Sequence, residues 1–374
     1  MRRLGPVFLR ADVQARDIGY DDNIRFDAEE SEGDFTATIV PGLDAIILAG
    51  DRGGLRVEQD FDYVAFRTNT DLNHWNSAGR ARGLLLLRPA LLSVEGRYAS
   101  IEERPNTEVD ERMRREENGL LAAAKTRTGG RLALGASVGV ASFDFNPESP
   151  DGEEIARRLD RSERTGTIEG EYRILAKTRF TMEGVLQKLE FDDTSEGRGS
   201  TARTLMPGLH FDSSAAIQGD VKMGIVDLHA PGQPEDGYRG TVGEAHLGAR
   251  LIRSGRVKLE GSRELVVSVV PDSLFFLETK WSGAYEQFFT QRTSAEVEYG
   301  RGLVTYPGDG NPPAGSTAGR EREDHLTSYR LGMKYRLASR LALALSLERL
   351  VRDSNVDSLD RDRNLYAIGS TVEF

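Results

Sequence analysis

The chain has 374 residues, no cysteine and a formal net charge of −11. The missing cysteines exclude disulfides, thiolate metal sites and cysteine nucleophiles. The acidic balance argues against a nucleic-acid-binding surface, which needs a basic excess. Hydrophobic residues make up 38% of the sequence, and no run approaches the roughly 18 apolar residues of a membrane helix. The 40 glycines, 11 tyrosines and 15 phenylalanines indicate many strands and turns.

The N-terminal stretch has no signal-peptide pattern. After Pro6, the only apolar run before Arg10 is residues 7–9, which is far shorter than the apolar region of a signal peptide. If the protein is exported, we expect the numbered chain to be a mature or trimmed form.

Period-two alternation of apolar and polar residues is the dominant pattern along the chain. Because successive side chains of a strand point to opposite faces, each run predicts a strand with one apolar and one polar face. Many runs span about 10 to 15 residues, which suits membrane-spanning strands better than the shorter strands of globular sheets. Clear examples of the apolar members, in chain order, are Ile168, Gly170, Tyr172 and Ile174; Val257, Leu259, Leu265 and Val267; Phe275, Leu277, Trp281 and Tyr285; Tyr329, Leu331, Met333, Tyr335 and Leu337; and Leu341, Leu343, Leu345 and Leu347.

The predicted connections alternate between short turns and longer loops. Short turns are predicted at residues 51–54, 88–89, 128–131, 176–177, 213–215, 253–256, 290–292 and 338–340. Longer loops, acidic or rich in Pro and Gly, are predicted at residues 27–34, 146–154, 192–199, 231–237, 307–324 and 352–364. Outer-membrane barrels have short periplasmic turns and longer extracellular loops. The sequence therefore predicts a single domain over residues 1–374: an all-β, closed antiparallel transmembrane β-barrel of about eighteen strands.

The chain ends within a predicted strand. Tyr366, Ile368, Val372 and Phe374 share one face of this strand, and Phe374 is the last residue. Gly369, Val372 and Phe374 form a pattern that resembles the C-terminal signal by which outer-membrane barrels are recognised for insertion. We therefore expect the barrel-assembly machinery to be a partner and the bacterial outer membrane to be the location.

Several segments, taken in order, resemble the putative β-barrel porin 2 family. They are residues 19–24 (GYDDNI); 41–43, 62–63 and 73–76; 102–107 (EERPNT) with 112–118; 201–208; and 261–265. The resemblance extends over most of the chain. It implies an outer-membrane barrel of Gram-negative bacteria that assists passage of a secreted polysaccharide, together with polysaccharide-export and copolymerase proteins.

Charged residues of both signs occupy the predicted lumen face. They predict a hydrated wall, or salt-bridge ladders between neighbouring strands that rigidify it. The candidate pore-lining residues are Glu95, Arg97, Glu169, Glu171, Arg173, Glu244, Arg250, Lys258, Glu260, Glu278, Lys280, Glu296, Glu298, Arg330, Lys334 and Arg336.

Motifs of catalysis and metal binding are lacking. The five histidines are scattered without metal-ligand spacing, and no Gly-x-Ser-x-Gly nucleophile elbow occurs. Neighbouring acids such as Glu296 and Glu298 are only superficially similar to the carboxylate pair of a glycosidase. We therefore expect a protein that is not an enzyme, with no cofactor, no metal and no nucleic-acid partner.

The leading functional hypothesis is a conduit for secreted polysaccharide, lying among outer-membrane lipid and lipopolysaccharide. One alternative is a general diffusion porin for small solutes, for which residues 307–324 are the candidate inward-folded constriction loop. Another is a structural sleeve or anchor whose lumen is filled by a partner protein. A soluble β-protein is a further alternative, which detergent extraction distinguishes from a membrane barrel.

Overall fold

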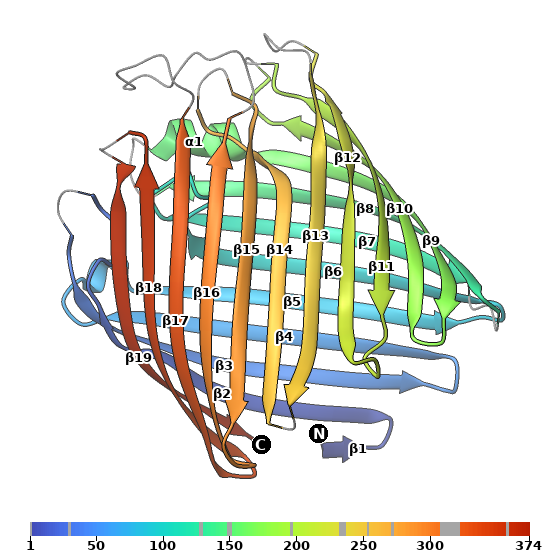
Figure 1. Cartoon of the computed structure of the whole chain (residues 1–374), viewed down its shortest axis with the longest axis horizontal. Coiled ribbons are helices and arrows are strands. Elements are labelled where there is room, and N and C mark those ends of the chain that lie inside the picture. The colour runs from blue at the N-terminus through green and yellow to red at the C-terminus, as the bar shows by residue number, and fades with distance from the viewer. Residues whose placement is uncertain are drawn as a thin grey trace.

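The computed structural model describes residues 2–28, 31–126, 130–147, 152–194, 197–231, 237–252, 254–270, 273–306, 322–356 and 359–374 (Figure 1). Strands make up 76% of the structure and helices 4%. The prediction of an all-β chain is confirmed.

The strands follow one another along the chain with few interruptions. In chain order they are β1 (Arg2–Leu4), β2 (Val7–Asp21), β3 (Asp34–Ala49), β4 (Gly53–Phe66), β5 (His74–Leu86), β6 (Ala90–Glu103), β7 (Met113–Thr126), β8 (Leu132–Pro147), β9 (Arg161–Leu175), β10 (Thr178–Phe191), β11 (Ser200–Phe211), β12 (Ile217–His229), β13 (Gly237–Ile252), β14 (Gly255–Val267), β15 (Phe275–Phe288), β16 (Thr293–Thr305), β17 (Glu323–Ala338), β18 (Leu341–Ser354) and β19 (Arg361–Glu373). A 3-10 turn, η1 (Thr70–Leu72), precedes β5, and one α-helix, α1 (Gly152–Leu159), precedes β9.

The sheet closes on itself. Each strand from β2 to β19 pairs antiparallel with the next, and β19 pairs back with β2, for example Tyr366 with Tyr20. The short strand β1 folds onto β2 as a hairpin. The closed barrel therefore has 18 strands, as predicted. Closure satisfies the backbone N–H and C=O groups that an open edge would expose to lipid.

The outer face of the barrel is apolar. Leu331, Leu347 and Ile368 lie on this face of adjacent strands and are 52%, 36% and 57% exposed. An apolar surface of this extent suits a hydrocarbon environment. The opposite face carries the polar members of each alternating run.

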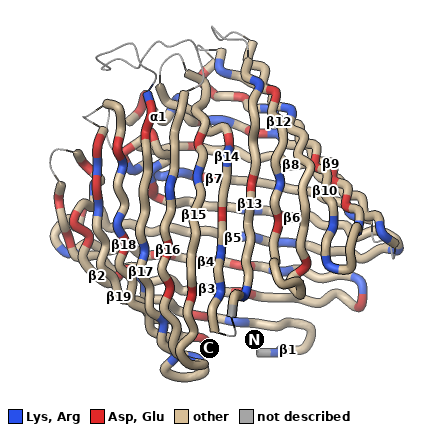
Figure 2. Tube along the Cα trace, in the orientation of Figure 1, with Lys and Arg blue, Asp and Glu red and all other residues tan. Residues whose placement is uncertain are grey.

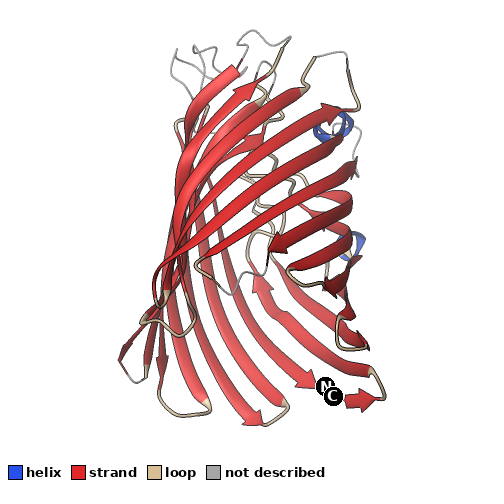
Figure 3. Ribbon diagram, turned by 90° about the vertical axis from the view of Figure 1, so that its right-hand side faces the viewer, coloured by secondary structure: helices blue, strands red, loops and turns tan. Residues whose placement is uncertain are grey.

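The two ends of the barrel differ. At the end where both termini lie, the connections are short, such as residues 87–89 and 339–340. The other end carries α1 and the longer connections, drawn at the top of Figures 1 and 3. Residues 104–112 and 268–274 are also long connections at this end, and neither was predicted as a loop from the sequence. The loop predicted at 352–364 is shorter than expected, since β18 continues to Ser354 and β19 begins at Arg361.

Helix α1 begins in the loop predicted at 146–154, extends beyond it to Leu159, and was not expected. It has only eight residues, with Glu153 and Glu154 in its first turn and Arg157 and Arg158 in its last. These charges complement the helix dipole, but so short a helix depends on tertiary packing for its stability. Among the described residues, no helix is long and apolar enough to cross a membrane.

Closure of the barrel predicts a strict requirement for glycine at position 19. The chain bulges between Arg16 and Gly19, and a Cβ atom on Gly19 would lie 1.7 Å from the carbonyl oxygen of Tyr366 in β19. We expect Gly19→Val to destabilise the barrel by at least about 1–3 kcal/mol and to lower the yield of the folded, faster-migrating form on unheated gels. The matched control is Gly332→Val, where the nearest atom to the new Cβ is 3.9 Å away. Equal folded yields for both variants would contradict the prediction.

Candidate functional site

The connection between β6 and β7 crosses the inside of the barrel. Asn106 Nδ2 donates to the carbonyl oxygen of Val267 at 3.0 Å, and Glu108 accepts from Ser268 Oγ and Val269 N, both at 2.8 Å. Strands β6 and β14 lie on nearly opposite sides of the barrel, so these contacts span the lumen. Figure 3 shows loop segments within the outline of the barrel. We call residues 104–112 the crossing loop.

Ion pairs fasten the crossing loop to the wall formed by β17, β18 and β19. Asp110 pairs with Arg352 at 3.2 Å and with Arg361 at 2.7 Å. Arg352 is only 1% exposed and also pairs with the buried Asp324 at 2.9 Å. Asp324 in turn pairs with Arg322 at 2.7 Å. Breaking a buried network of this kind is strongly destabilising, because each removed partner leaves a desolvated charge behind.

Apolar packing supports the other side of the crossing loop. Val109 and Met113 are buried against Phe145 of β8 and against Ala156 and Leu159 of α1. Helix α1 therefore packs at the long-loop end of the barrel and holds the loop from the side opposite its ion pairs. The loop is fixed at both flanks, which favours a permanent constriction over a freely moving flap.

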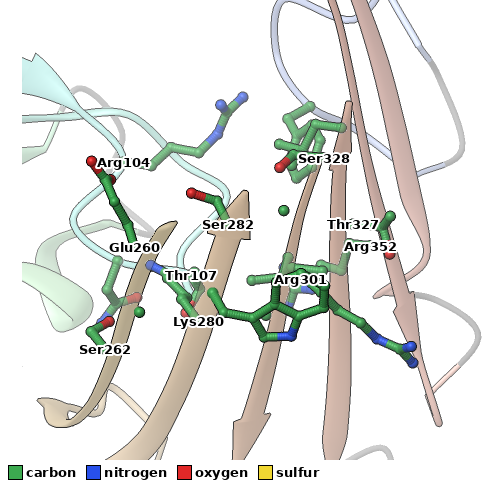
Figure 4. A pocket seen from close by; sticks show the side chains of 18 of the residues that line it. Arg104, Thr107, Glu260, Ser262, Lys280, Ser282, Arg301, Thr327, Ser328 and Arg352 are labelled. Atoms are coloured by element: carbon green, nitrogen blue, oxygen red, sulfur yellow. The ribbon is translucent and has the colours of Figure 1, made fainter. Parts of the chain in front are cut away.

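A cavity of about 490 Å³ lies between the crossing loop and the wall of β13 to β18. Its wall combines small or hydroxyl-bearing residues with charged and apolar ones. Gly300 and Gly302 of β16 leave space there. Figure 4 shows the side chains around it, with Arg104 and Thr107 from the crossing loop and Arg352 from β18. The polar lining from the wall strands includes Glu260, Ser262, Lys280, Ser282 and Ser328.

Arg104 is a cation of this cavity that has no ion-pair partner among the described residues. Its Nε donates to the carbonyl oxygen of Asp110 at 2.9 Å, its guanidinium lies 5.0 Å from the ring centroid of Phe26, and its Nη2 has no hydrogen-bond partner. Burial, together with the nearby positive charges of Arg112 and Arg363, lowers the pKa of Arg104 to about 10. The group therefore stays charged at neutral pH, and its buried Nη2 keeps N–H donors that no other group uses.

The predicted pore-lining residues all lie on the polar face of their strands. In the strand register they alternate with the outward-facing apolar residues, and most join ion pairs with a residue of the same strand, the adjacent strand or the next strand but one; Figure 2 shows the interleaved positive and negative positions. These pairs are Arg80–Glu95 (3.6 Å), Arg97–Glu117 (2.8 Å), Lys125–Glu169 (3.2 Å), Lys125–Glu171 (2.6 Å), Lys222–Glu244 (2.8 Å), Lys258–Glu296 (3.2 Å), Lys280–Glu278 (2.6 Å), Arg330–Glu298 (3.6 Å) and Arg330–Glu348 (2.8 Å).

The remaining predicted residues have no ion pair within the described part of the chain: Arg173, Arg250, Glu260, Lys334 and Arg336. Glu260 and Lys280 are the two members of the predicted set that line the cavity. A role in contacting a solute stays a prediction for all of them. Among the described residues, no group of three or more acidic or histidine side chains is placed to hold a metal ion.

The residues of the C-terminal pattern are held in the closing strand pair. Val372 pairs with Val13, and Gly369 packs against the backbone of Ala15. Phe374 donates its backbone N–H to Ala11 and is 57% exposed. Their use as an insertion signal stays a prediction.

Sequence reasoning missed the residues that build the constriction. Arg104 lies in a segment noticed only for its family resemblance, and Glu108 and Asp110 lie between two such segments. The constriction was expected at 307–324, most of which lies outside the described residues. The available signal was a dense polar segment around Pro105 between two amphipathic runs. No local pattern, however, indicates that such a segment turns inward.

The family model for putative beta-barrel porin 2 matches residues 2–374. The chain belongs to this family. It is thus a porin-like β-barrel of the bacterial outer membrane. A comparison with curated proteins found no match.

Solved porin structures share the fold of this family member. The outer membrane protein OpdK from Pseudomonas aeruginosa is 15% identical, with a TM-score of 0.53 over 98% of this chain and 99% of OpdK. A structure of OpdK with vanillate has 13% identity and a TM-score of 0.54, with the same coverage. OccAB3 from Acinetobacter baumannii is 11% identical, with a TM-score of 0.52 over 98% of this chain and 99% of OccAB3. At such low identities the likeness concerns the fold.

The fastening of the crossing loop is tested by Asp110→Asn. This change removes the ion pairs with Arg352 and Arg361 and costs about 2 kcal/mol of loop attachment, which shifts the docked–released equilibrium roughly thirtyfold. We expect larger and noisier single-channel currents. Asp71→Asn is the control, because Asp71 is 71% exposed and its pair with Arg25 is 3.6 Å long. Currents identical to wild type in both variants would show that Asp110 does not hold the loop.

The crossing loop also carries a pH-sensitive group. Burial raises the pKa of Glu108 above its ordinary 4.5, against the opposing effect of the nearby Tyr306 hydroxyl and of its donors Val269 N and Ser268 Oγ. Because the pKa of Glu108 is higher in the folded protein than its ordinary 4.5, its contribution to the free energy of unfolding is most favourable below pH 4.5. That contribution is lost as the pH rises through the folded-state pKa of Glu108. In Glu108→Gln this dependence is absent. We expect the difference in urea unfolding midpoint, variant minus wild type, measured in lipid bilayers, to be larger at about pH 8 than at about pH 4. A difference that does not change with pH would contradict this assignment.

Proposed function

We propose that this family member is a constricted porin that passes small polar solutes and favours hydroxylated anions. The observation that carries the proposal is the crossing loop, which is fastened to the far wall by Asp110 and Glu108 and divides the lumen. A diffusion porin with size selectivity needs such an inward-folded element. The crossing loop therefore favours the small-solute channel, for which an inward-folded constriction loop is expected.

The lining of the narrowed part supports the preference for hydroxylated anions. Arg104 supplies a charged guanidinium without an ion-pair partner among the described residues. Ser262, Ser282 and Ser328 supply hydroxyl groups that act as donors or acceptors. The channel works without covalent chemistry: binding at the cavity orders a solute, and the concentration gradient gives direction.

A polysaccharide conduit is the second candidate, and the family resemblance favours it. Serine hydroxyls around the cavity also suit the hydroxyl groups of a polymer. Passage of a chain would require the crossing loop to leave the lumen, so polysaccharide-export and copolymerase proteins would have to release Asp110 from Arg352 and Arg361. The small-solute porin therefore requires the crossing loop to stay in the lumen, whereas the conduit requires the loop to leave it.

Single-channel conductance in planar bilayers tests the proposal, with glucuronate and glucose as probes. We expect glucuronate to interrupt the current of wild-type protein at lower concentration than glucose, because only glucuronate pairs with Arg104. Arg104→Gln should weaken the glucuronate effect about tenfold or more, the usual worth of a charge-assisted hydrogen bond, and leave the glucose effect unchanged. Lys334→Gln is the control, since Lys334 is a wall cation away from the cavity.

Other outcomes assign other functions. Equal interruption by the two sugars would exclude anion selectivity. Interruption by long polysaccharide but by neither monomer would favour the conduit. Protein that is folded but never conducts would leave the sleeve or anchor that a partner fills.

A further inference from the structure

A second hollow lies on the outer, lipid-facing surface of the barrel and crosses β4 to β9. Its volume is about 820 Å³. Two adjacent rows of outward-facing side chains line it, and the backbone of the row between them forms its floor. In strand order, one row is Gln59, Gly79, Tyr98, Asn118, Ser142 and Ser162, and the other is Val57, Ala81, Gly96, Leu120, Val140 and Arg164.

Small residues create this groove within a rim of large ones. Gly79 and Gly96 lie in its middle, and a Cβ atom on Gly96 would meet no atom within 4 Å. Tyr98, Leu120 and Val140 stand around them, 43%, 53% and 53% exposed. An open slot with apolar walls matches the shape and chemistry of an acyl chain.

The groove is inclined relative to the membrane. At one end Val57 lies close to Gly53, where β4 begins at the short-turn end of the barrel. At the other end Arg164 lies close to Arg161, where β9 begins at the long-loop end. Because porins place their long loops outside the cell, the Arg164 end faces the headgroups of the outer leaflet.

Positive charge and hydroxyl groups gather at this outer end. Arg164 pairs in register with Lys188 of β10, and Ser142 and Ser162 lie in the neighbouring row. Glu190 forms ion pairs with both cations, at 3.2 Å with Arg164 and 2.6 Å with Lys188. One carboxylate shared by two cations leaves an excess positive charge, which is complementary to a phosphate.

We propose that this groove is a binding site for a phosphorylated, acylated glycolipid of the outer leaflet, of the lipid A type. Its phosphate binds Arg164 and Lys188, Ser142 and Ser162 contact its sugar, and one acyl chain lies over Gly96 and Gly79. The charge at the outer end distinguishes this occupant from a second copy of the chain, whose apolar outer surface would not neutralise the excess positive charge of Arg164, Lys188 and Glu190.

Native mass spectrometry of the full chain in mild detergent tests the proposal. The probes are bis-phosphorylated lipid A and a dephosphorylated form of the same lipid. We expect wild-type protein to bind the phosphorylated form preferentially. Arg164→Gln should weaken its binding about fivefold, the usual contribution of one cation near a charged lipid surface. Gly96→Leu fills the slot and should reduce binding of both forms.

Matched controls exclude general effects of charge and bulk. Arg301→Gln removes an exposed outward arginine on β16, and Gly261→Leu adds bulk to the outer face of β14, where the nearest atom to the new Cβ is 3.6 Å away. Both should bind lipid A like wild type, and gel mobility before heating verifies that every variant is folded. The proposal would be overturned if wild-type protein bound the two lipid forms equally, or if the control variants lost as much binding as Arg164→Gln and Gly96→Leu. It would also be overturned if the protein formed dimers that Gly96→Leu dissociates.

Discussion

Hydrogen bonding of the backbone in a medium without water is the constraint on which the rest of the structure depends. An open sheet would leave a row of peptide groups unsatisfied in lipid, so β19 must pair with β2. Closure fixes the two faces of every strand, since a slip by one residue would exchange them. The apolar face then meets lipid, and the candidate pore-lining charges are directed into the lumen.

The contents of the lumen follow from this arrangement. Opposite charges on nearby strands form ion pairs, such as Arg97–Glu117, that hold the wall without making it apolar. At the long-loop end, buried charge and apolar packing cooperate: Arg352 and Asp324 hold the crossing loop on one side, and Met113 packs near α1 on the other. The cavity at Arg104 is the space that remains between this loop and the glycine- and serine-rich wall.

The sequence predicts the barrel because its pattern is local and repeated. Alternation in runs such as Leu341–Leu347, with short turns between runs, determines strand direction and facing without knowledge of distant contacts. The crossing loop was not predictable in the same way. Its position depends on contacts between Asp110 and Arg361 or between Glu108 and Ser268, which are far apart in the sequence. The external groove was hidden for a similar reason, because Gly79 and Gly96 become neighbours only through strand register.

The central claim is that residues 104–112 cross the lumen and reach the opposite wall. The chain has no cysteine, so a single introduced pair of cysteines can be cross-linked without any reaction at native cysteines. In the folded protein, Asn106→Cys combined with Val269→Cys should be joined by a short bis-maleimide, and the joined protein should conduct like wild type. Failure of this pair to react, while cysteines at the neighbouring wall positions Arg330 and Glu348 are joined readily, would show that the loop does not cross and would contradict the account.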